Sequence, residues 1–102
     1  MTTFVPVYPE ADLPSGAAAL VTVDERAIAL FNVNGQLFAV SDTCTHDEAS
    51  LAEGEVFGCV VECPLHGARF DLRTGRALSL PAVYPVASFP VRVSDGMVEV
   101  EI

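Results

Sequence analysis

The 102-residue sequence has no lysine and no tryptophan, only two histidines and only three cysteines. Five arginines stand against 14 acidic residues, which gives a formal net charge of −9. This balance argues against binding to nucleic acids, because phosphate contacts need clustered cations. The acidic surface either keeps the protein soluble or steers it toward basic partner surfaces. Three cysteines are an odd number for a disulfide scaffold, and they indicate a reducing compartment.

Long hydrophobic runs are also missing. The longest, such as residues 17–21, fall far short of the roughly 20 residues of a membrane span. The first residues lack the basic and apolar regions of a secretory signal. We therefore expect a soluble, cytoplasmic protein without a membrane association. We also expect one domain over residues 1–102, because the chain is too short for a catalytic domain plus a carrier domain.

The residues that are present predict an all-β fold. Short runs rich in Val, Ile and Phe alternate with turn signals roughly every ten residues, as in sandwiches and barrels. Asn34-Gly35 is the strongest hairpin signal, since a type I′ turn needs positive φ at both central positions. No helix is expected, and residues 80–85 form a proline-bearing loop. The expected extended segments are 3–8, 17–23, 26–33, 36–41, 56–57, 60–61, 68–72, 86–93 and 97–102.

Both histidines and two of the cysteines stand in two short motifs, Cys44-Thr45-His46 and Cys63-Pro64-Leu65-His66. The motifs are separated by 16 residues, and each follows an expected strand. Two adjacent loops on a β scaffold can hold a metal centre between them, because the sheet fixes their separation. The sequence therefore predicts a metal site with Cys44, His46, Cys63 and His66 as ligands.

The order of the ligands bears on which metal binds. Structural zinc sites usually take their cysteines from one Cys-x2–4-Cys pair and their histidines from another, although a mononuclear zinc site stays possible here. A Cys–His nucleophilic pair is a weaker interpretation, because no third orienting group or oxyanion hole stands nearby. A [2Fe–2S] cluster explains the order directly. One iron takes two thiolates and the other takes two imidazoles, so each loop gives one ligand to each iron.

The two motifs, with Gly67 after the second, resemble the signature of Rieske iron–sulfur proteins. The resemblance covers nearly the whole chain, including Asn34-Gly35, Phe70-Asp71 and the Pro81 loop. The chain is most similar to the small Rieske ferredoxins of multicomponent aromatic-ring-hydroxylating dioxygenases. This resemblance implies a Rieske-type β-sandwich of short antiparallel strands. It also implies a small cluster-binding subdomain formed by two loops, about 42–50 and 62–70, beside a proline loop at about 79–85.

The resemblance also implies roles for the ligands. Cys44 and Cys63 would bind the buried iron. His46 and His66 would bind the outer iron through Nδ1, with their outer edges exposed as the electron port. Cys59 lies outside the pattern, and we expect it to be a small buried hydrophobic residue in a strand, without a redox role.

Residues around the motifs indicate a low reduction potential. High-potential Rieske proteins carry an extra cysteine in each loop, and Ser and Tyr hydroxyls after the second motif. Here Leu65, Ala68 and Phe70 stand in the corresponding positions of the second loop. Hydrogen bonds to cluster sulfurs raise the potential, so their loss predicts a value near the low end of the range of about −150 to +300 mV. The six acids and no base between Ser41 and Glu62 act in the same direction.

With both histidines in the cluster, none remains for a mononuclear oxygen-activating iron. We therefore expect an electron carrier and no catalytic residues. The resemblance implies transfer of single electrons from an NAD(P)H-dependent flavoprotein reductase to a terminal Rieske non-haem iron aromatic-ring dioxygenase. Both contacts would be transient, the protein a monomer, and the docking patch centred on the two histidines with Leu65, Pro81 and Val83. Two alternatives remain, a small Rieske subunit of another oxidoreductase such as a nitrite reductase, and a zinc-stabilised binding module.

Overall fold

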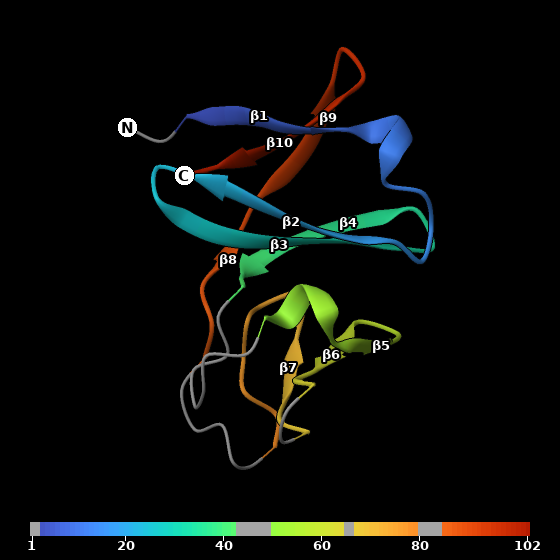
Figure 1. The fold of residues 1–102 in the computed structure, drawn as a ribbon, viewed down its shortest axis with the longest axis vertical. Helices are drawn as coiled ribbons and strands as arrows, with labels where there is room; N and C mark the ends of the chain where they lie inside the picture. Colours follow the sequence, from blue (N-terminus) through green and yellow to red (C-terminus); the bar gives the residue numbers. More distant parts are fainter. Residues whose placement is uncertain (1–2, 43–49, 65–66, 80–84) are drawn as a thin grey trace.

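The computed structural model describes residues 3–42, 50–64, 67–79 and 85–102 (Figure 1). Nearly all regular structure in these ranges is β-strand, and none of their helical segments is long and apolar enough to cross a membrane. The elements are, in chain order, β1 (Phe4–Pro9), the 3-10 turn η1 (Glu10–Asp12), β2 (Ala18–Val23), β3 (Arg26–Val33), β4 (Gln36–Ser41), the 3-10 turn η2 (Leu51–Glu53), β5 (Glu55–Phe57), β6 (Val60–Glu62), β7 (Arg69–Asp71), β8 (Ser88–Phe89), β9 (Val91–Ser94) and β10 (Met97–Glu101).

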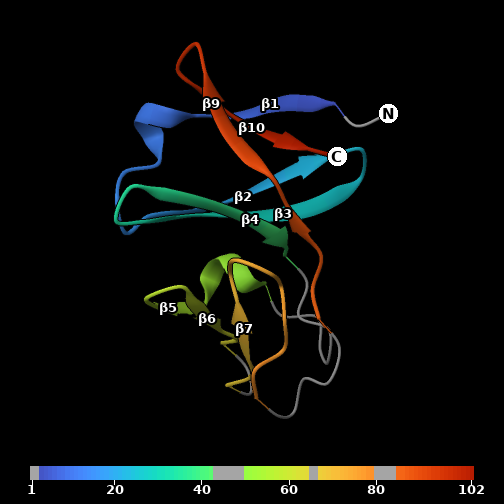
Figure 2. The same cartoon turned by 180° about the vertical axis from the view of Figure 1, so that it is seen from behind.

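The strands form three antiparallel sheets. Their strand orders are β1-β10-β9, β2-β3-β4-β8 and β5-β6-β7. Figures 1 and 2 show the first two sheets together at one end of the molecule, with β5, β6 and β7 at the other end. The expected all-β sandwich with a small subdomain is therefore confirmed. The subdomain has a three-stranded sheet of its own in addition to the expected loops.

β3 is buried on both faces, because it lies between two hydrophobic cores. Ile28 and Leu30 pack with Val98 and other residues in the core of the sandwich. The alternate residues Ala29 and Phe31 belong to a second core that includes residues of β6 and β7. Successive side chains of a strand point to opposite faces, so the continuous apolar run of β3 serves both cores. The second core joins the small subdomain to the sandwich.

The tight turns form as the sequence predicts. Asn34 and Gly35 have φ values of 53° and 90°, and the turn joins β3 to β4. Asp24 and Glu25, with φ of 49° and 66°, join β2 to β3. Positive φ at both central positions gives a turn whose twist matches that of the flanking strands. β4 consequently pairs with β3 over Gln36–Ser41, the range predicted for the returning strand.

The expected continuous strand over residues 86–93 is wrong. β8 pairs with β4, β9 pairs with β10, and Pro90 separates them. Proline has no backbone N–H to donate to a ladder, so it interrupts the strand at this position. The Pro90 carbonyl still accepts a 3.0 Å hydrogen bond from the Glu101 N–H. The chain thus crosses from one sheet of the sandwich to the other at Pro90.

Two smaller expectations are also corrected. The short 3-10 turns η1 and η2 lie where no helix was expected. Cys59 lies in the turn between β5 and β6, and it is half-buried instead of fully buried in a strand. Its carbonyl accepts a 2.8 Å hydrogen bond from the Leu72 N–H. This position suits a turn, because Gly58 beside it has a φ of 59°.

Candidate metal centre

β6 leads directly into the second motif, and Cys63 is the one expected ligand that lies among the described residues. Cys44, His46 and His66 lie outside them, as do Leu65, Pro81 and Val83 of the expected docking patch. Cys63 is only 1% exposed, and it packs in the core that also contains Val61 and Phe70. A thiolate ligand of a buried iron would require this kind of environment, shielded from water.

Backbone hydrogen bonds close the loop that follows Cys63. The Cys63 N–H donates to the Ala68 carbonyl over 2.7 Å, and the Gly67 N–H donates to the Cys63 carbonyl over 3.1 Å. Gly67 has a φ of 74°, which favours glycine at this position. Main-chain contacts therefore hold Cys63 beside Gly67 and Ala68, which follow the second motif.

An ion pair lies across the base of the same loop. Glu62 and Arg69 face each other in the β6–β7 register, and Arg69 Nε donates to Glu62 Oε1 over 3.0 Å. The Arg69 guanidinium lies 5.2 Å from the ring centroid of Phe57. The backbone N–H of Arg69 also donates to Ser79 Oγ over 3.0 Å. Arg69 thus connects the second loop to the start of the expected proline loop.

Asp42 lies at the base of the first loop, immediately after β4. It is 5% exposed and is the only buried charged side chain in the part of the chain that the structure describes. Its Oδ1 accepts hydrogen bonds from Ser50 Oγ and the Ala52 N–H, each 2.9 Å long. Its backbone carbonyl accepts a 2.7 Å bond from the Leu51 N–H. In the sequence Asp42 is one of six acids between Ser41 and Glu62, and only its place two residues before Cys44 distinguishes it from the others.

The far end of the proline loop is fixed at Gly75. The Val86 N–H donates to the Gly75 carbonyl over 2.8 Å. Gly75 has a φ of 80°, and a Cβ added there would collide with the Val86 carbonyl. Glycine is required at this position for both its backbone conformation and its close approach to Val86.

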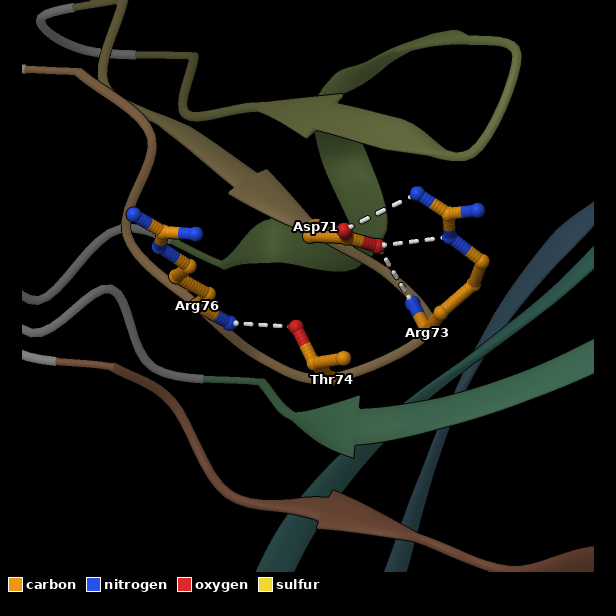
Figure 3. Close-up of polar contacts among 4 residues, drawn as sticks. All are labelled: Asp71, Arg73, Thr74 and Arg76. Atoms are coloured by element: carbon orange, nitrogen blue, oxygen red, sulfur yellow. Dashed lines mark hydrogen bonds and ion pairs between the residues drawn. The ribbon is translucent and has the colours of Figure 1, made fainter.

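The turn between β7 and Gly75 is organised by Asp71 (Figure 3). Asp71 Oδ1 accepts from the Arg73 N–H over 2.8 Å and from Arg73 Nε over 3.2 Å, and the Asp71 carbonyl accepts from the Gly75 N–H over 2.7 Å. The Arg73 side chain and N–H hold the pKa of Asp71 below its ordinary value, and Asp71 raises the pKa of Arg73 in turn. Arg76 closes the turn by donating its N–H to Thr74 Oγ1 over 3.2 Å.

The ends of the three loops meet in one buried core. Leu51 follows the first loop, Cys63 and Ala68 bound the second, and Val86 follows the third. All four residues are at most 4% exposed and belong to the same core. Each of the three loops therefore has at least one end on a common apolar base. Two thiolates and two imidazoles on loops anchored in this way suit a [2Fe–2S] cluster with mixed ligation.

The model of the Rieske [2Fe-2S] domain family matches residues 3–90 of this chain. The chain therefore belongs to the Rieske [2Fe-2S] family, and the expected cofactor is one Rieske-type cluster. This chain is 44% identical over 95 residues to the 3-phenylpropionate/cinnamic acid dioxygenase ferredoxin subunit of Escherichia coli K12. The match covers 92% of this chain and 89% of that protein.

Solved structures give the same result. The ferredoxin of carbazole 1,9a-dioxygenase from Nocardioides aromaticivorans IC177 superimposes with a TM-score of 0.90 at 34% identity, covering 96% of each chain. A chain from a complex of reduced oxygenase and oxidized ferredoxin in carbazole 1,9a-dioxygenase superimposes with a TM-score of 0.87 at 39% identity, covering 95% of this chain and 91% of that one. The resemblance inferred from the motifs is thus confirmed.

Proposed function

We propose that this chain is the ferredoxin component of a multicomponent aromatic-ring dioxygenase. It carries single electrons from an NAD(P)H-dependent flavoprotein reductase to a terminal Rieske non-haem iron oxygenase. The observation that carries this proposal is the near-complete coverage of both chains in the match to a dioxygenase ferredoxin subunit. That relative is a ferredoxin subunit, matched at 44% identity over 89% of its own length.

Cys44 and Cys63 are the proposed ligands of one iron, and His46 and His66 those of the other. The burial of Cys63 and the anchoring of the loop ends in one core support this assignment. When bound, the cluster supplies one-electron redox chemistry. The residues around Cys63 exclude water from the thiolate side. Ala68 and Phe70, both fully buried in that core, offer no side-chain hydroxyl to the cluster.

The organisation around this site is also a proposal. Residues 1–102 form one domain with cluster loops at about 42–50 and 62–70 and a proline loop at about 79–85. The protein acts as a monomer in the cytoplasm, where the reductase meets NAD(P)H. Contacts with the reductase and the oxygenase are transient, since electron-transfer encounters bury little surface.

Reconstitution tests this function directly. The purified chain is mixed with the flavoprotein reductase and the oxygenase from the same cell, and each component is omitted in turn. We expect NAD(P)H-dependent product formation only when all three proteins are present, and no oxygen consumption by the chain alone. Product formation at the full rate without the chain would contradict the proposed function.

A further inference from the structure

We propose that Asp42 is a positioning residue that closes the first metal-binding loop as a hydrogen-bond acceptor. This inference rests on the proposed ligand roles of Cys44 and His46. Asp42 is the first residue of that loop, and it is contacted by Ser50, the last residue of the loop, and by Leu51 and Ala52 directly after it.

Asp42, Ser50, Leu51 and Ala52 form a hydrogen-bonded cluster that joins the two ends of the first loop, and we call this cluster the clasp. One carboxylate oxygen accepts two hydrogen bonds, from the Ser50 hydroxyl and the Ala52 N–H, and the Asp42 carbonyl accepts a third from Leu51. The side chain is 5% exposed, so water cannot easily replace a lost acceptor. A buried donor left without its partner carries a large desolvation cost. Removing the Asp42 carboxylate would therefore leave two donors without their acceptor, and only the main-chain bond from Leu51 would still join the two ends of the loop.

Both halves of the clasp are attached to rigid parts of the molecule. The Asp42 N–H donates to the Ala27 carbonyl of β3 over 2.9 Å. On the other side, Leu51 is fully buried in the core that contains Cys63. The clasp thus fixes the start of the first loop to the central sheet and its end to the core beneath the second loop. Ligands on a loop are held in place only as well as the residues that support it.

The two cluster loops are closed by different means. The second loop is closed by main-chain bonds between Cys63, Ala68 and Gly67. Its side-chain pair, Glu62 and Arg69, is partly exposed to solvent, with side chains 29% and 51% exposed. Exposed ion pairs contribute little to stability. The first loop has one main-chain bond, from the Leu51 N–H to the Asp42 carbonyl, and two further bonds that depend on the buried Asp42 side chain. Removing Asp42 should therefore affect the cluster more than removing Glu62.

The experiment compares cluster retention among single variants of the full chain. The rate of cluster loss to an iron chelator is followed by visible absorbance, and the reduced cluster is examined by EPR. We expect Asp42→Ala to lose the cluster about tenfold faster, consistent with the cost of an unpaired buried donor, and to show shifted g values. Ser50→Ala, which removes one of the two side-chain bonds, should lie between Asp42→Ala and wild type.

Two further variants separate hydrogen bonding from charge and from general stability. Asp42→Asn keeps an oxygen acceptor, so its loss rate should stay within about twofold of wild type because both bonds can still form. Asn32→Ala is the matched control. Asn32 also makes two side-chain hydrogen bonds, donating to the Leu13 carbonyl and accepting from the Gly35 N–H, both over 2.8 Å, but in the sandwich half. It should lower the unfolding temperature and leave the EPR spectrum unchanged.

The proposed role of the clasp would be overturned if Asp42→Ala lost the cluster at the wild-type rate. It would also be overturned if Asn32→Ala accelerated cluster loss as much as Asp42→Ala does. Asp42→Asn behaving like Asp42→Ala would overturn the acceptor role. If Asp42→Ala does not fold, Ser50→Ala and Asp42→Asn still decide the question. A wild-type chain without a Rieske EPR signal would contradict the proposed function itself, whereas wild-type signal with unaffected variants would contradict only the clasp.

Discussion

Cys63, Ala68 and Phe70 are the described residues on which the expected reduction potential depends. All three are at most 1% exposed and share one core. The Ala68 carbonyl accepts a hydrogen bond from the N–H of Cys63, so Ala68 lies next to the expected ligand in the second loop. Neither Ala68 nor Phe70 has a hydroxyl. The cluster should therefore be reduced only at a low potential.

Introducing hydroxyls at these two positions should raise the midpoint potential. We expect Phe70→Tyr and Ala68→Ser each to raise it by about 60 mV, the equivalent of one hydrogen bond of about 1.4 kcal/mol that forms more strongly in the reduced state. Phe89→Tyr, at a partly buried position in the sandwich core, is the control and should leave the potential unchanged. Voltammetry at neutral pH provides the measurement. A wild-type midpoint well above zero, or no response to either substitution, would contradict this account of the tuning.

Gly75 is constrained both by its backbone conformation and by its packing against Val86. Gly75 and Gly96 have similar φ values, 80° and 75°, but only at Gly75 would a Cβ meet a neighbouring backbone. Both alanine substitutions carry the left-handed backbone cost of about 1–2 kcal/mol. Gly75→Ala should cost clearly more, since Val86 must also move. Chemical unfolding of both variants checks this, and equal destabilisation would show that the contact with Val86 is unimportant.

The turn after β7 is an element whose stability should depend on pH. The pKa of Asp71 is lower in the folded protein than in the unfolded chain because of Arg73. Ionised Asp71 therefore stabilises the fold at pH values above the unfolded pKa of about 3.9, and this stabilisation is lost as the pH falls through the folded pKa.

We expect wild type to exceed Asp71→Asn in unfolding free energy near neutral pH, with the difference shrinking as the solution becomes acidic. Arg73→Gln should reduce the same difference, because it removes the partner of Asp71. Asp12→Asn, an exposed acid in η1, serves as the control. Denaturant unfolding at a series of pH values measures the difference. A constant difference between wild type and Asp71→Asn across the series would argue against the pairing.

The elements differ in how well the sequence predicts them. The hairpin at Asn34-Gly35 is predictable, because positive φ at two successive residues is a local requirement that few residue types meet. The division of the strand at Pro90 depends on which sheet each half joins, which is a long-range property. Cys59 was misplaced for a related reason, since apolar neighbours do not distinguish a strand from a tight turn in a short run.

In the candidate site, too, some features can be predicted from the local sequence and others depend on long-range contacts. The ligand motifs are visible in the sequence because their residue types and spacing are chemically restrictive. The supporting residues are not visible in this way, since the role of Asp42 depends on Ser50 and Ala52, which lie 8 and 10 residues further along the chain. The meeting of Leu51, Cys63 and Val86 in one core likewise depends on the tertiary fold.

For the whole molecule, the net charge of −9 should influence association with partners. We expect electron transfer to the oxygenase, at low protein concentration, to slow as salt is added, because screening weakens attraction to a basic docking surface. Glu55→Gln, in the small sheet that adjoins the cluster loops, should reduce the rate more than Glu10→Gln in η1, although both change the net charge equally. Stopped-flow kinetics at several ionic strengths measures both effects. A rate independent of salt would indicate that the acids serve solubility alone.

The central claim is that two thiolates and two imidazoles of this chain hold a Rieske [2Fe–2S] cluster. EPR with electron–nuclear double resonance on the reduced protein tests it most directly, together with iron and sulfide analysis of the same sample. We predict equal amounts of iron and acid-labile sulfide, and two histidine nitrogens coupled to the reduced cluster, with the coupling lost in His46→Ala or His66→Ala. A colourless protein with one zinc and no sulfide, or a cluster without nitrogen coupling, would contradict the claim.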